Sequence, residues 1–119
     1  MKRKEVIYAV AFHGIPVDRQ VNGEVESGGI VMKPGTRGNI ELACASLIKE
    51  CLENATPDIH DDAPLTTENY QALQQALEEF RDMTLETMLI PQLRAKTEDS
   101  FDAQIKLLQE MQRKSTGEA

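Results

Sequence analysis

The stretch 66-TTENYQALQQALEEFRDMTLETMLI-90 decides the fold, because it is the longest part of the chain with one consistent period. Its apolar side chains recur at three- and four-residue spacing, which predicts an amphipathic helix from Thr66 to Ile90. The expected buried stripe consists of Tyr70, Leu73, Ala76, Leu77, Phe80, Met83 and Thr84. Such a helix is not stable alone in water, so it must pack against the rest of the chain or against a second copy.

Two further helices are predicted beside it. Thr66 is expected to cap the long helix, and Pro91 to end or kink it at Ile90. A second helix is expected from Asn39, as its N-cap, through Ile40–Asn54. The side chains expected on its buried face are Ile40, Ala43, Cys44, Leu47, Ile48 and Cys51. The last helix is expected from about Ser100 to Arg113, with Phe101, Ile105, Leu108 and Met111 as its stripe.

The N-terminal third has the pattern of strands. In Glu5–Phe12 the side chains expected on one face of a strand and those expected on the other are both apolar. This favours a strand that is covered on both faces. Asn22-Gly23 is a strong signal for a type I′ hairpin turn, because both residues tolerate positive φ. After this hairpin, Ile30–Met32 is expected to resume as a strand and to stop before Pro34.

Together these elements predict an α+β fold: a small antiparallel sheet of about three N-terminal strands followed by about three helices. The length of 119 residues suits one domain. We expect a β-rich part at 1–38, a helical part at 39–114 and a frayed tail at 115–119.

The formal charge of −7 is unevenly distributed. Residues 1–40 hold six basic and four acidic side chains, a net +2, and residues 41–119 hold seven basic and sixteen acidic ones, a net −9. The C-terminal part would therefore repel a phosphate backbone, and only the N-terminal part is suited to face an anion.

No apolar run approaches the ~20 residues that a membrane-spanning helix needs. The two cysteines, Cys44 and Cys51, are too far apart on one helix for a disulfide within the chain. We therefore expect a cytoplasmic protein in which both thiols are reduced and pack as small core side chains.

The loop Lys33–Asn39 is the candidate site for an anion or a nucleic acid. Glycines lead into a helix N-terminus, where free N–H groups attract negative charge. The residues assigned to this site are Lys33, Gly35, Thr36, Arg37, Gly38 and Asn39. The simpler interpretation, which we favour, is a turn that uses glycine for its backbone freedom.

No other pattern indicates catalysis, a metal or a cofactor. His60 lies among Asp58, Asp61 and Asp62, but this spacing fits no metal-binding loop, and a solvated acidic linker is the better interpretation. His13 has no nucleophile or carboxylate placed beside it by sequence logic. An enzyme that uses either histidine is the hypothesis we rank last, and we expect no enzyme.

The end of the long helix is apolar nearly all round and rich in methionine, which suits an adaptable partner surface. The residues assigned to this interface are Phe80, Met83, Leu85, Met88 and Leu89. The sequence therefore favours a small acidic, non-enzymatic regulator or assembly protein that binds another protein or itself as a dimer. A bacterial or phage-encoded inhibitor or adaptor fits this size and charge. The alternative is a nucleic-acid-binding regulator that uses the basic N-terminal part and the Lys33–Asn39 loop.

Overall fold

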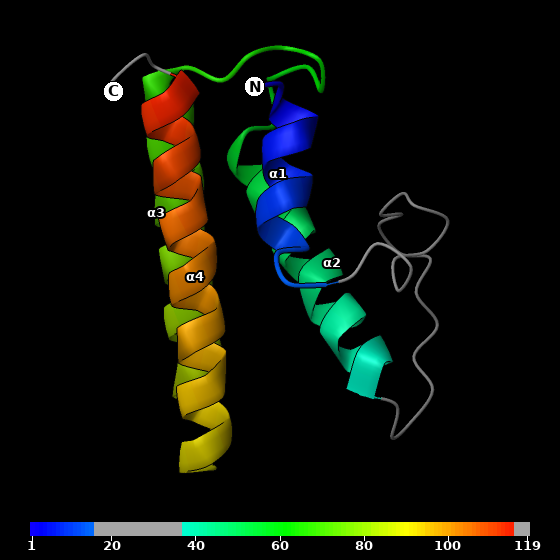
Figure 1. The fold of residues 1–119 in the computed structure, drawn as a ribbon, viewed down its shortest axis with the longest axis vertical. Helices are drawn as coiled ribbons and strands as arrows, with labels where there is room; N and C mark the ends of the chain where they lie inside the picture. Colours follow the sequence, from blue (N-terminus) through cyan, green and yellow to red (C-terminus); the bar gives the residue numbers. More distant parts are fainter. Residues whose placement is uncertain (16–36, 116–119) are drawn as a thin grey trace.

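The computed structural model describes the backbone of residues 1–15 and 37–115, and the side chains of residues 1–15 and 44–115. This part of the chain forms four helices and no strand; they are α1 (Arg3–Ala11), α2 (Arg37–Ala55), α3 (Thr67–Glu86) and α4 (Pro91–Ser115). The predicted α+β fold is therefore wrong for the described residues, which form an α-helical bundle (Figure 1).

Helix α1 replaces the strand that was predicted at Glu5–Phe12. Four of its side chains, Val6, Ile7, Val10 and Ala11, are at most 1 % exposed. Their spacing of one, three and one residues is that of a helical stripe as much as of a two-faced strand, so the apolar pattern alone does not separate the two. The predicted hairpin at Asn22-Gly23 and the predicted strand Ile30–Met32 lie outside the described residues.

Helix α2 begins at Arg37, three residues before the predicted start, so that Asn39 is inside the helix and is not its N-cap. Its buried face is also rotated from the predicted one. Ala45, Ile48 and Leu52 are buried, whereas Leu47 is 54 % exposed and Cys44 is exposed. The rotation follows from packing, because α2 must contact α1 on one side and α3 on the other.

The long helix begins where the sequence predicted. The Asn69 N–H donates to Thr66 Oγ1 at 3.2 Å, and the Thr66 N–H donates to Asn69 Oδ1 at 2.9 Å, which completes a capping box. The helix ends at Glu86, and Pro91 opens the next helix at the first position, where a missing N–H costs nothing. Helix α4 therefore begins nine residues before the predicted Ser100.

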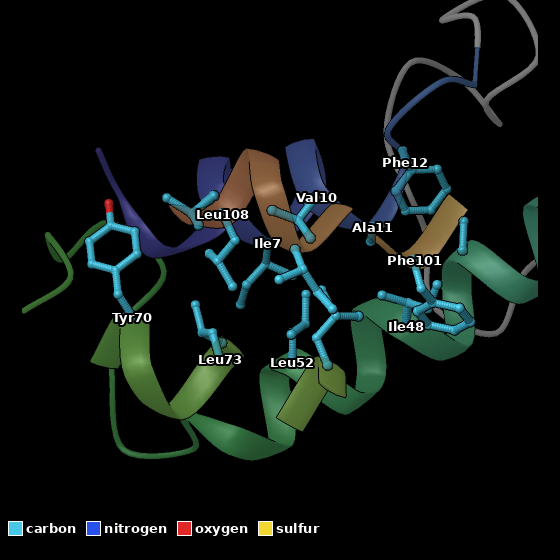
Figure 2. Packing of buried hydrophobic residues seen from close by; sticks show 14 of the residues in the cluster. Ile7, Val10, Ala11, Phe12, Ile48, Leu52, Tyr70, Leu73, Phe101 and Leu108 are labelled. Carbon is cyan, nitrogen blue, oxygen red and sulfur yellow. The ribbon is translucent and has the colours of Figure 1, made fainter. Parts of the chain in front are cut away.

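Successive helices run antiparallel, and each of α1 and α3 packs against both α2 and α4 (Figure 1). The core lies where all four meet (Figure 2). Its largest fully buried side chains are Tyr70, Ile7, Leu52, Leu73, Leu77, Leu108, Val6 and Val10. Because α1 has 9 residues and α4 has 25, the hairpin of α3 and α4 extends well beyond the end of α1.

Candidate protein-interaction surface

The free end of the α3–α4 hairpin carries most of the exposed large apolar side chains of the described residues. Four of the six lie there: Leu89 is 91 % exposed, Met83 66 %, Ile90 58 % and Leu93 50 %. We call these four residues the tip patch. Single exposed apolar side chains are ordinary, whereas several at one end of a molecule make that end a candidate interaction site.

On α4 the tip patch continues the face that forms the core. Counting back from buried Leu108 and Phe101 in steps of three and four residues leads through Thr97 to Leu93 and Ile90. Higher in the bundle this face of α4 packs against α1 and α3, and it lacks the cover of α1 at the tip because α1 is short (Figure 1). At Ile90 and Leu93 the patch is therefore a continuation of the buried face of α4 that is left open.

The sequence at the tip also departs from local helix preferences. Ile90 occupies the position before the first turn of α4, and its carbonyl accepts a hydrogen bond from the Arg94 N–H at 2.9 Å. This position favours Ser, Thr, Asp or Asn, whose side chains can satisfy free N–H groups, whereas Ile cannot. Fully exposed Leu89 stands just before it, in a turn. Departures of this kind are expected where a residue serves function rather than folding.

A shallow hollow of about 370 Å³ lies beside the patch. Its lining is Met88, Leu89, Pro91, Arg94, Ala95 and Glu98, so that apolar and charged groups meet at its edge. A second hollow of about 450 Å³, between α3 and α4, is lined by Gln71, Gln74, Gln75, Glu78 and Gln112. The first hollow is the one that adjoins the tip patch, at Leu89.

The residues assigned to the interface from the sequence fall into two groups. Met83 and Leu89 are exposed in the patch, and Met88 is half-buried beside it. Phe80 packs on Phe101, with ring centroids 5.9 Å apart, and Leu85 is buried. These two side chains support the hairpin from within.

Ile90 and Leu93 were not among the interface residues predicted from the sequence. Leu93 was missed because Pro91 was interpreted as the end of a helix rather than as the first residue of the next. The signal that could have found both is the register of α4, since extending its stripe back from Phe101 reaches them.

The other candidate site, the loop Lys33–Asn39, lies outside the described residues at Lys33, Gly35 and Thr36. The backbone of Arg37, Gly38 and Asn39 belongs to the first turn of α2.

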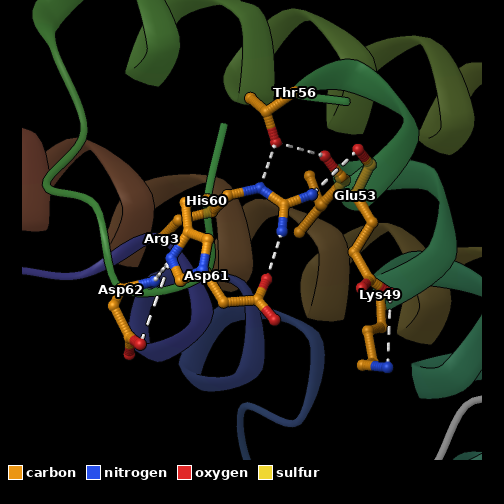
Figure 3. A network of polar contacts seen from close by, with 8 residues as sticks. Arg3, Lys49, Glu53, Thr56, His60, Asp61 and Asp62 are labelled. Atoms are coloured by element: carbon orange, nitrogen blue, oxygen red, sulfur yellow. Dashed lines mark hydrogen bonds and ion pairs between the residues drawn. The ribbon is translucent and has the colours of Figure 1, made fainter. Parts of the chain in front are cut away.

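The basic N-terminal part was expected to face an anion, but one of its basic side chains, Arg3, is buried and bonded within the protein. Arg3 is 6 % exposed; its Nε donates to Thr56 Oγ1 at 2.9 Å and its Nη2 to the carbonyl of Glu53 at 3.1 Å, while Nη1 pairs with Asp61 (Figure 3). The Glu53 carbonyl belongs to the last turn of α2, which has no basic residue of its own. Arg3 therefore caps α2 from another helix, where the dipole favours a cation.

The acidic linker around His60 is likewise used for structure. The Arg3 N–H donates to the Ala63 carbonyl at 2.9 Å, and the Lys4 N–H donates to the Asp61 carbonyl at 3.0 Å. His60 Nδ1 accepts from the Asp62 N–H at 3.1 Å. The two bonds from Arg3 and Lys4 tie the linker to the start of α1, and the Asp61 carboxylate pairs with the Arg3 side chain (Figure 3).

The remaining reactive side chains stand apart from one another. His13 is exposed beyond the end of α1. Burial, and to a smaller extent the carboxylate of Glu79, raises the pKa of the Cys51 thiol, which disfavours its reactive thiolate form. Among the described residues, no three His, Cys, Asp or Glu side chains gather as they would around a metal ion.

Comparison with protein-family models, with curated proteins and with solved structures found no match to this chain. Across residues 1–15 and 37–115, none of the helices combines the length and the apolar character that crossing a membrane requires.

Proposed function

We propose that this protein acts by binding another protein chain through the tip patch, as a small non-enzymatic regulator or assembly factor. The observation that carries the proposal is the continuation of the core face of α4 into exposed Ile90 and Leu93. A surface of interior character at the end of a helical hairpin resembles one layer of a bundle whose opposite layer is missing.

Two further features support this proposal. Exposing Leu89 and placing Ile90 at a helix start costs stability locally, and a partner that covers them recovers that cost. Asp and Glu dominate residues 41–119, which keeps the rest of the surface well hydrated and leaves the tip as the apolar contact region. We place this activity in a reducing cytoplasm, because Cys44 and Cys51 lie two turns apart on α2, too far for a disulfide with each other.

Site-specific photo-crosslinking in the host cell tests the proposal. A photoreactive amino acid replaces Leu89 in one variant and Leu47 in a matched control, since Leu47 is also exposed and apolar but lies on α2. We expect a protein adduct from position 89 and none from position 47.

The mass of the adduct identifies the class of partner, because one copy of this chain adds 13.3 kDa. The absence of any adduct at position 89, or equal adducts from both positions, would overturn the proposal.

A further inference from the structure

We draw no further inference here: the strongest candidate, the open apolar face at the free end of the α3–α4 hairpin around Ile90 and Leu93, carries none, because nothing in the structure shows what covers it.

Discussion

Arg3 links three parts of the chain through a single side chain. Its guanidinium contacts the hydroxyl of Thr56, the carbonyl of Glu53 and the carboxylate of Asp61, and so joins α1 to the end of α2 and to the linker that follows. Hydrogen bonds from a charged donor are stronger than neutral ones, and burial protects them from competing water.

Replacing Arg3 with Met is expected to lower the free energy of unfolding by roughly 2 kcal/mol, because bonds to a charged group are lost while the apolar stem is kept. Urea denaturation measures this change. Lys2→Met is the matched control, since Lys2 is basic, adjacent and exposed. Equal stability of the two variants would show that the Arg3 contacts contribute nothing.

At the scale of residues the sequence was only partly informative. It showed three basic side chains at positions 2–4, a pattern that suggests a solvated anion-binding surface. Nothing local distinguishes Arg3 from Lys2 and Lys4, because its burial depends on Glu53, Thr56 and Asp61, which are some fifty residues away. The surroundings of Tyr8 also depend on a residue far away in the sequence. Lys49 is buried, and its Nζ lies 5.1 Å from the centroid of the Tyr8 ring.

At the scale of elements, the start of α3 is the feature that its own sequence determines best. Thr66 and Asn69 satisfy each other's backbone N–H groups without help from any other helix. This is why its boundary was predicted correctly, whereas the start of α2 was not.

Replacing Thr66 with Ala is expected to cost about 1 kcal/mol of stability, the usual cost of losing a side-chain cap. Thermal and urea unfolding measure it. Thr67→Ala is the control, because Thr67 is exposed, begins the helix and accepts no capping bond. A Thr66→Ala protein as stable as its Thr67→Ala counterpart would contradict the assignment of the cap.

The element that the sequence misassigned is α1. Its β-branched residues and two-sided apolar pattern favour a strand when the segment is considered alone. Packing decides otherwise, because Val6, Ile7, Val10 and Ala11 fill the space between α2 and α4 only as a helical stripe. Intrinsic preference is a weak guide when nearly every side chain of a short segment is buried.

At the scale of the whole molecule, the bundle has two regions that differ in what holds them together. The upper region has four helices around one core, which includes Phe101 with Phe80 packed against it. The lower region is the end of the α3–α4 hairpin, where Leu85 is buried. Stability and binding are therefore expected to depend on different side chains.

Leu77→Ala and Leu93→Ala make this difference measurable. Leu77 is fully buried in the core, and truncating it is expected to lower the free energy of unfolding by about 2–5 kcal/mol. Leu93 is half exposed in the tip patch, and its truncation is expected to stay within about 0.5 kcal/mol when measured on dilute monomer. Urea denaturation compares the two, and a large loss for Leu93→Ala would show that the patch belongs to the core.

The candidate site followed from the sequence in part. The amphipathic stretch showed that the end of the long helix has more apolar surface than one face can bury, and it pointed to Met83 and Leu89. Which of its side chains stay exposed depends on where α1 ends and where α4 begins, and those limits come from the packed bundle.

The two ends of the described chain meet at the end of the bundle opposite the tip, where the Met1 amino group lies 3.5 Å from Ser115 Oγ (Figure 1). A circular permutant could be made by joining these ends with a short peptide and placing the new termini in the connection between Thr87 and Ile90. Such a permutant would keep every helix and its core contacts while dividing the tip patch between the new ends, so it would separate folding from recognition in a single rearranged gene.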